Sequence, residues 1–397
     1  MKTTDCHPEA TGAVPRPLPR FFPWLGVLLA VWSLLAVFPA PHVFLWLLAI
    51  GATEFGHWLA PACLCVALLL ARHPNARAWC IPAGCAALLF FSPSLRAWAC
   101  ARDFSRAHPE LATPSSPPFS FRKLWIPHTG SSPAPEKLAV NSSPHPPLEL
   151  VFTRSASRTP APCLLILHTG GWNSGSADEF RPLSRHLSGL GYASAALEYR
   201  LAPAARWPAQ RDDVVAALQH LESHASELGI DPSQFVLLGR SAGGQIAEAC
   251  AYGLNHPAIR GVIAFYAPAD LIFARQFARS DDVLNSLKLL RDFLGGDPEE
   301  VPDAYRSSSA IALANPQSPP TLLLHGSRDE LVWVLQSRRL HAHLQKIGAQ
   351  SHFLELPWAT HAFDFNPHGP GGQISTWAVE GFLRRILPTP PNREVPR

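Results

Sequence analysis

Charged residues are scarce in this chain, and the scarcity is greatest before residue 101. They make up 16% of the 397 residues, whereas an average soluble protein has about 25%. Between Phe21 and Ala101 the only acidic residue is Glu54. Because a stretch with so little charge is more stable in lipid than in water, the sequence predicts a membrane region over residues 21–101.

Basic clusters and metal-binding spacings are also missing. The net charge is +3 and the arginines are scattered, so nothing is typical of a nucleic-acid groove. The 18 histidines show no His-Glu-x-x-His spacing and the eight cysteines no Cys-x-x-Cys spacing. Only Cys163 and Cys250 lie outside the tail and membrane region, and both are expected to be small core residues. We therefore expect no nucleic-acid partner, no metal and no other cofactor, and cysteine usage indicates no redox compartment.

The membrane region consists of three apolar segments, and we expect about three transmembrane helices. The segments cover residues 21–38, 43–71 and 79–99. The second would form one tilted helix or two shorter ones separated near Gly56 or Pro61, and the third is interrupted by Pro82 and Pro93. A cleaved signal peptide is the rival interpretation of the first segment, but it would not be followed by two further apolar segments.

Two ionisable residues stand inside the second segment. Glu54 and His57 are three positions apart and could share one helical face. Ionisable groups inside a bilayer are often functional, but the simpler interpretation is that these two pair with each other or reach a polar interface. We assign them no catalytic role.

The basic residues near the segment ends bear on orientation. They form three groups: Lys2, Arg16 and Arg20; Arg72 and Arg77; and Arg96, Arg102 and Arg106. The first two groups favour a cytoplasmic N-terminus with the large domain outside, whereas the last group argues for the opposite. We expect a multi-pass protein and favour the outside placement.

The remainder divides by composition. We expect tails at residues 1–20 and 391–397, a Pro- and Ser-rich linker or irregular lead-in to the sheet at 102–147, and one large domain at 148–390. In that domain strand and helix patterns alternate. Strands are predicted at 148–153, 162–168, 192–199, 235–238, 260–266, 321–325 and 351–356, and helices at 180–190, 207–228, 245–252, 282–294, 334–347 and 374–386. This order predicts an α/β fold with a doubly wound, mostly parallel sheet covered by helices on both faces.

Gly239-Arg240-Ser241-Ala242-Gly243 lies between a predicted strand and a predicted helix. A Gly-x-Ser-x-Gly turn in that place exposes a serine hydroxyl to a base, and the helix that follows directs a backbone N–H at a developing oxyanion. The glycines leave room for the turn. By itself the pattern is only moderately specific, since glycine and serine are common in turns.

Three other loops follow predicted strands. His168-Thr169-Gly170-Gly171 offers unobstructed backbone N–H groups, as an oxyanion hole needs, although a plain tight turn is the alternative. Asp329 could orient an imidazole, or could simply cap a helix. The adjacent Glu330 is the alternative candidate for the orienting carboxylate. His361 becomes the general base when it is placed in the order Ser241, Asp329, His361.

These segments resemble the α/β-hydrolase superfamily, in particular its hormone-sensitive-lipase-like and carboxylesterase group, which includes feruloyl-esterase-like and prenylcysteine-methylesterase-like members. The matching segments are His168 to Trp172, Glu198 to Pro203, Gly239 to Gly244, His325-Gly326 with Asp329, and His361 to Phe363. The resemblance covers more than half of the chain.

The resemblance implies a role for each matching residue. It implies that Ser241 is the nucleophile, His361 the base and Asp329 the orienting carboxylate. The N–H groups of Gly170, Gly171 and Ala242 would form the oxyanion hole. Tyr199, Arg200 and Pro203 would support the loops. One departure is Thr169, which stands where the family usually has glycine, so the local backbone is expected to differ slightly.

We therefore expect a membrane-anchored hydrolase that cleaves small, apolar carboxylic esters through an acyl-enzyme intermediate. One alternative is another reaction on the same three residues, as in an amidase, a formamidase or an acyltransferase. The other is a hydrolase-like domain that has become a non-catalytic binding module. No oligomeric state is predicted.

Overall fold

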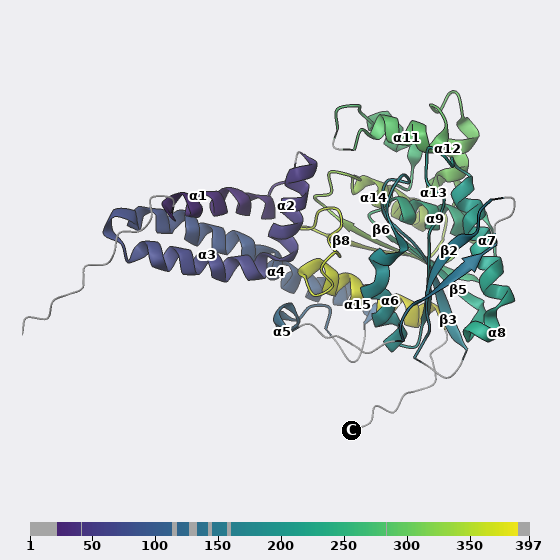
Figure 1. The fold of residues 1–397 in the computed structure, drawn as a ribbon, viewed down its shortest axis with the longest axis horizontal. Coiled ribbons are helices and arrows are strands. Elements are labelled where there is room, and N and C mark those ends of the chain that lie inside the picture. Colours follow the sequence, from purple (N-terminus) through teal and green to yellow (C-terminus); the bar gives the residue numbers. More distant parts are fainter. Residues whose placement is uncertain are drawn as a thin grey trace, which may run out of the picture.

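The chain is described by a computed structural model that covers residues 22–40, 42–112, 117–126, 133–141, 145–156, 160–282 and 284–387. The expected tails at 1–20 and 391–397 lie outside the described residues. The described chain has two parts: an α/β part, and a group of apolar helices that projects from one side of it (Figure 1).

The α/β part is built on one sheet of eight strands, in the order β1-β2-β4-β3-β5-β6-β7-β8. Strands β3 to β8 run parallel, whereas β1 and β2 pair antiparallel at one edge. The strands are β1 (Glu136–Val140), β2 (Leu148–Thr153), β3 (Ala161–Leu167), β4 (Ala193–Leu197), β5 (Ile230–Arg240), β6 (Ile259–Phe265), β7 (Thr321–Gly326) and β8 (Ser351–Leu356). The fold class expected from the sequence is confirmed.

Helices cover both faces of this sheet (Figure 1). One face packs against α7 (Ala209–Ser223), α8 (Ala225–Leu228), α9 (Ala242–Gly253) and α14 (Leu335–Lys346), and the other against α6 (Arg181–Gly189) and α15 (Pro370–Ile386). Every residue of β3 is buried, as expected for a strand covered on both faces. The remaining helices of this part are α10 (Leu271–Phe277), α11 (Ser286–Leu294), α12 (Pro302–Ser308) and α13 (Ala310–Leu313).

The segment expected to be a linker contains regular structure. Strand β1 and the short helix α5 (Phe121–Trp125) both fall within residues 102–147. In β1 the partly buried Glu136 and Leu138 alternate with exposed residues, so its apolar signal is weak, and pairing with β2 stabilises it as an edge strand. This strand is absent from the sequence-based prediction.

The apolar part consists of α1 (Phe22–Ser33), α2 (Val43–Glu54), α3 (Gly56–Ala71) and α4 (Cys80–Ala107), with 3₁₀ turns η1 (Leu34–Ala36) and η2 (Pro74–Trp79). Helices α1, α3 and α4 lie side by side, and α2 crosses the end nearest the α/β part (Figure 1). Close packing depends on small residues, since a Cβ on Gly56 would lie 2.0 Å from the Phe90 carbonyl oxygen.

The three expected spans differ from what the structure contains. Within the described residues one helix, residues 74–107, is long and apolar enough to cross a membrane, and α2 with α3 qualifies as a pair bent by 84°. The first segment forms a helix of 12 residues, shorter than the ~20 that a span requires. The third is continuous, because Pro82 lies in the first turn of α4, where its missing N–H has no intrahelical acceptor, and Pro93 is tolerated among packed helices.

Glu54 and His57 do not pair with each other, so of the two simpler expectations the pairing is wrong. Glu54 ends α2, and its carboxylate accepts a hydrogen bond from the backbone N–H of Gly371 at 2.9 Å. The His57 ring lies in α3 against Trp125 of α5, with ring centroids 5.5 Å apart. The break at Phe55 separates the two side chains, and Glu54 instead connects the apolar part to the α/β part.

Candidate active site

Ser241 occupies a sharp turn between β5 and α9. Its φ is 52° and its ψ is −121°, a conformation that costs a non-glycine residue about 1–3 kcal/mol. A Cβ on Gly239 would lie 2.2 Å from the Gly243 oxygen, and one on Gly243 would lie 2.1 Å from the Leu167 oxygen. Both glycines are therefore needed for close backbone approach, which brings the turn against the end of β3.

The structure brings Ser241, His361 and Asp329 together from three loops. His361 Nε2 lies 3.0 Å from the Ser241 hydroxyl oxygen, and His361 Nδ1 lies 2.6 Å from Asp329 Oδ2. The three residues follow β5, β8 and β7, so they meet at the carboxyl ends of the strands. A ring nitrogen that accepts from a hydroxyl while the other donates to a carboxylate can move a proton from the serine.

Asp329 is fully buried and held from several sides. Its Oδ1 accepts the backbone N–H groups of Leu331 and Val332 at 2.9 and 2.8 Å. Burial alone would raise the pKa of this carboxyl, but the charge on His361 and hydrogen bonds from His325 and His361 outweigh it and lower the pKa to about 2. Asp329 is therefore ionised at neutral pH, as orientation of an imidazole requires. Its neighbour Glu330 is exposed.

His325 is a supporting residue that belongs to a segment matching the family but was given no role from the sequence. Its Nε2 lies 3.3 Å from Asp329 Oδ2 and 2.8 Å from the Val332 carbonyl oxygen, and its Nδ1 contacts the Ser337 hydroxyl. Its place at the end of β7, four residues before Asp329, is the signal that could have identified it.

The glycine loop after β3 adopts a left-handed backbone. Gly170 has φ of 107° and Gly171 has φ of 58°, and a Cβ on Gly170 would lie 2.0 Å from the Ser174 carbonyl oxygen. The Ser174 hydroxyl donates to the Gly170 carbonyl oxygen. Because Ala242 is the first residue of α9, its N–H has no intrahelical acceptor. The assignment of these amides to an oxyanion hole stays a prediction.

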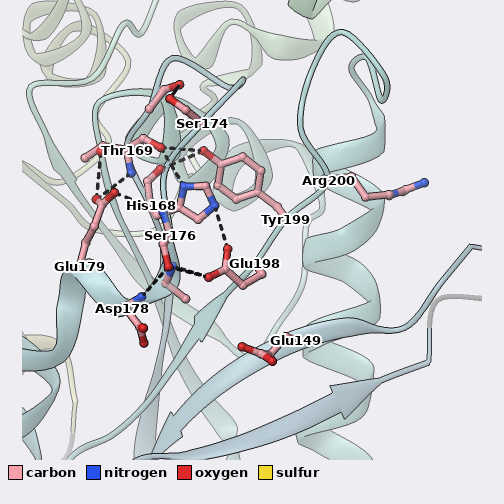
Figure 2. A network of polar contacts seen from close by, with 12 residues as sticks. Glu149, His168, Thr169, Ser174, Ser176, Asp178, Glu179, Glu198, Tyr199 and Arg200 are labelled. Carbon is pink, nitrogen blue, oxygen red and sulfur yellow. Dashed lines mark hydrogen bonds and ion pairs between the residues drawn. The ribbon is translucent and has the colours of Figure 1, made fainter.

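A network of polar contacts surrounds the start of the glycine loop at His168 and Thr169 (Figure 2). The His168 ring stacks on Tyr199 with centroids 4.0 Å apart, and the Tyr199 hydroxyl donates to the His168 carbonyl oxygen at 3.0 Å. Thr169 is not among the residues with positive φ, and its hydroxyl donates to Glu179. Threonine in place of the family's usual glycine is therefore accommodated without left-handed strain.

The Tyr-Arg-Leu-Ala-Pro segment makes structural contacts. Arg200 donates from its backbone N–H and from Nε to the buried carboxylate of Asp213, at 2.8 and 2.7 Å. With the Tyr199 contacts, these bonds connect the glycine loop to the start of α7. They support the interpretation that this segment stabilises the loops around the site.

Helix α11 covers the glycine loop with apolar side chains. A Cβ on Gly171 would lie 3.2 Å from the Leu289 side chain. Phe293 stacks on Trp172 with ring centroids 4.3 Å apart, and the Trp172 indole N–H donates to Gln245 of α9. This helix lies within the 282–294 segment expected to be helical.

His108, Glu110 and His352 have ligand atoms close enough together to hold a metal ion. Glu110 Oε1 lies 3.4 Å from His108 Nδ1 and 3.0 Å from His352 Nδ1. His352 is near the amino end of β8, whereas Ser241 is at the carboxyl end of its strand, so this group is separate from the serine site. Polar contacts of both rings with Glu110 account for the arrangement.

Known proteins are similar to this chain in sequence. A family model described as BD-FAE matches residues 150–344. The probable carboxylic ester hydrolase LipM of Mycobacterium tuberculosis is 30% identical over 245 residues, which are 58% of this chain and 55% of LipM. The chain spans about half the length of the curated relatives that it matches.

Two solved structures are similar in fold. A bacterial heroin esterase is 24% identical with a TM-score of 0.57, and the match covers 64% of this chain and 84% of the esterase. Est2 from Thermogutta terrifontis, with propionate bound, is 24% identical with a TM-score of 0.54, and the match covers 66% and 97% of the two chains. At this identity the similarity shows the α/β-hydrolase fold alone.

Proposed function

Because the α/β part of this chain belongs to the carboxylesterase group of the α/β hydrolases, we propose that the protein hydrolyses carboxylic esters through an acyl-enzyme intermediate. The observation that carries the proposal is the connected series of Ser241, His361 and Asp329, with separations of 3.0 and 2.6 Å. The relative LipM is named as a probable carboxylic ester hydrolase, which agrees with this chemistry.

The reaction has two halves. Ser241 attacks the ester carbonyl carbon while His361 takes the hydroxyl proton, and Asp329 stabilises the imidazolium that forms. Collapse of the tetrahedral intermediate breaks the bond to the alcohol oxygen, which leaves with the proton from His361. Water then attacks the acyl-enzyme, His361 takes its proton, and the acid is released with Ser241 restored. The amides of Gly170, Gly171 and Ala242 stabilise the oxyanion in both halves.

The substrate we propose is a small ester with apolar groups. Leu289 lies over Gly171, and the Phe293 and Trp172 rings stack beside the same loop. Of these side chains Leu289 is partly exposed and offers apolar surface to an acyl or alcohol group, while Trp172 and Phe293 are buried and pack behind it. In a series of acyl esters of increasing chain length, kcat/KM should depend on the length of the apolar chain, and a flat profile would contradict this substrate class.

The apolar helices are proposed to hold the protein in a membrane. Helix α4 satisfies the length and composition of a span, and α2 with α3 does so as a bent pair. The turn that joins α3 to α4 carries Arg72 and Arg77 and lies at the end of the apolar part away from the α/β part (Figure 1). By the positive-inside rule, that turn faces the cytoplasm and the α/β part lies on the other side, in a multi-pass arrangement.

Replacement of the proposed nucleophile tests the function. Ser241→Ala should lower the hydrolysis of p-nitrophenyl butyrate by at least ~10³-fold, because the acyl-enzyme cannot form without the serine oxygen. Ser233→Ala, at an exposed position near the start of β5, is the matched control. A fluorophosphonate probe should label wild type and not Ser241→Ala. Wild-type activity in the Ser241→Ala protein would overturn the proposal, and ester products formed with an added alcohol would identify an acyltransferase instead.

A further inference from the structure

The apolar helices contact the α/β part at the loops that carry Asp329 and His361. Four hydrogen bonds between described residues cross this boundary, and three of them involve the side chains of Trp46, Arg328 and Glu54. The Trp46 indole N–H donates to the His361 carbonyl oxygen at 3.0 Å, Arg328 Nη1 donates to the Ala36 carbonyl oxygen at 2.6 Å, and the Gly371 N–H donates to Glu54 Oε2 at 2.9 Å. The two parts therefore meet beside two of the three residues proposed for the chemistry.

The bond from Trp46 is made at a strained peptide. Ala362, which follows His361, has φ of 61°, and a left-handed conformation is unfavourable for a residue with a side chain. Such a backbone persists only where its surroundings hold it. The His361 carbonyl oxygen belongs to the peptide bond that precedes Ala362, so the Trp46 indole holds the peptide that sets the direction of the His361 side chain.

The opposite side of the same loop is held from within the α/β part. The Tyr266 ring lies 4.4 Å from the His361 ring, and the Tyr266 hydroxyl donates to Asp364. Arg240, one residue before Ser241, forms an ion pair with Asp364. His361 is thus fixed between the core of the α/β part on one side and α2 on the other.

Arg328 connects the neighbouring loop to the same helices. It precedes Asp329, and its guanidinium reaches the carbonyl oxygen of Ala36 at the end of η1. Its backbone N–H donates to the Ala359 carbonyl oxygen at 3.0 Å. One residue therefore links the apolar part, the Asp329 loop and the His361 loop.

Glu54 extends the contact to the segment that follows His361. Its carbonyl oxygen accepts from the Asn366 side chain at 2.9 Å. A Cβ on Gly369 would lie 2.6 Å from Glu54 Oε2, and one on Gly371 would lie 3.1 Å from Oε1. The glycines at the start of α15 leave space for this buried carboxylate, so the fit between the two parts is close.

We propose that Trp46 is a positioning residue for His361, and that α2 is part of the active-site structure rather than a tether. The proposal rests on the proposed function, because it assigns His361 the transfer of the serine proton. Loss of the Trp46 N–H would let the 361–362 peptide turn and would move the imidazole away from the 3.0 Å separation from Ser241.

Trp46→Phe tests this by removing the N–H while keeping an aromatic ring. In the full-length protein in detergent, kcat for p-nitrophenyl butyrate should fall about tenfold, the worth of one buried hydrogen bond, and KM should stay the same. Trp32→Phe is the matched control. The Trp32 indole donates to the Leu48 carbonyl oxygen at 2.9 Å within the apolar part, so its loss should change kcat less than twofold.

A second readout separates positioning from general stability. If Trp46 acts through His361, Trp46→Phe should have no further effect on the residual rate of a His361→Ala protein. An equal fractional loss in both backgrounds, or a wild-type kcat in Trp46→Phe, would overturn the proposal and leave the esterase function intact. If the wild-type protein neither hydrolyses esters nor reacts with the fluorophosphonate, the proposed function fails instead.

Arg328→Met provides an independent variant if Trp46→Phe does not accumulate. It keeps the length of the side chain and removes the donors to Ala36. The expected result is again a lower kcat at unchanged KM. An unchanged kcat in this protein would contradict the role of the apolar part in holding the two loops.

Discussion

The apolar helices and the α/β part place their large hydrophobic side chains on opposite surfaces. In the α/β part these residues fill two cores, one on each face of the sheet. In the helices many point outward, as with Leu88 and Phe44, which are 74% and 68% exposed, while small residues such as Ala36, Ala52 and Cys63 are buried between the helices. This arrangement is typical of helices packed in lipid, where apolar surface has no reason to turn inward.

The boundary between the two parts is not a flexible connection. Ala97 and Ala101 of α4 belong to the core that α15 covers, and polar contacts from Trp46, Arg328 and Glu54 link the helices to the loops beside Ser241. The two parts therefore differ in their outer surfaces but are packed firmly against each other. The surface of the helices is suited to lipid and that of the α/β part to water, but the end of α4 belongs to a core of the α/β part.

The largest effect is expected from replacing the carboxylate of the α/β part that is proposed to orient His361. Asp329→Asn should lower kcat by about 10³–10⁴-fold, because an amide cannot stabilise the imidazolium. Glu330→Gln, one residue further and exposed, should leave kcat within about twofold. A large loss in Glu330→Gln with a small one in Asp329→Asn would reverse the assignment of the carboxylate.

A buried glutamate at the boundary between the two parts can be compared with one inside the α/β part. Both side chains are buried. Oε2 of Glu54 accepts a backbone N–H at the boundary, whereas Oε2 of Glu248 in α9 has no hydrogen-bond partner among the described residues. Burial raises the pKa of Glu248 to about 8. The folded protein therefore keeps this proton while the unfolded chain ionises, so its free energy of unfolding should fall as pH rises from about 4.5 to about 8.

Glu248→Gln measures that loss. One pKa unit corresponds to about 1.4 kcal/mol. In denaturant melts at pH 8 the free energy of unfolding of the variant should therefore exceed that of wild type by several kcal/mol, and the difference should be much smaller at pH 4.5. Glu227→Gln, on an exposed surface, should follow wild type at both pH values. Parallel pH profiles for Glu248→Gln and wild type would show that Glu248 is ionised inside the fold.

The smallest effect is expected at the helix surface. Leu88→Arg places a charge on an exposed position of α4, at a cost of about 2.5–3.5 kcal/mol if that position lies in the middle of a bilayer. The fraction of protein retained in carbonate-washed membranes should fall. Leu190→Arg, 40% exposed in the α/β part, should be retained like wild type. Equal retention of both variants would show that α4 does not face lipid.

Much of the α/β part could be predicted because its signals are local. The segments 148–153 and 351–356 form strands with the expected bounds, since apolar runs between turn residues indicate strands in any setting. Edge strand β1 was missed because its pattern is weak without its partner β2. Helix α4 was underestimated because its prolines break helices in isolation, and only its packed neighbours compensate.

The sequence by itself determined the order of elements, the fold class and the residues that stand after each strand, because periodicity and turn chemistry act over a few residues. Only the tertiary structure decided that α2 contacts the loops of Asp329 and His361. Trp46 and His361 are 315 positions apart, and a hydrogen bond between them leaves no trace in either local pattern. Such a contact forms only when the sheet has folded and the apolar helices have packed against it.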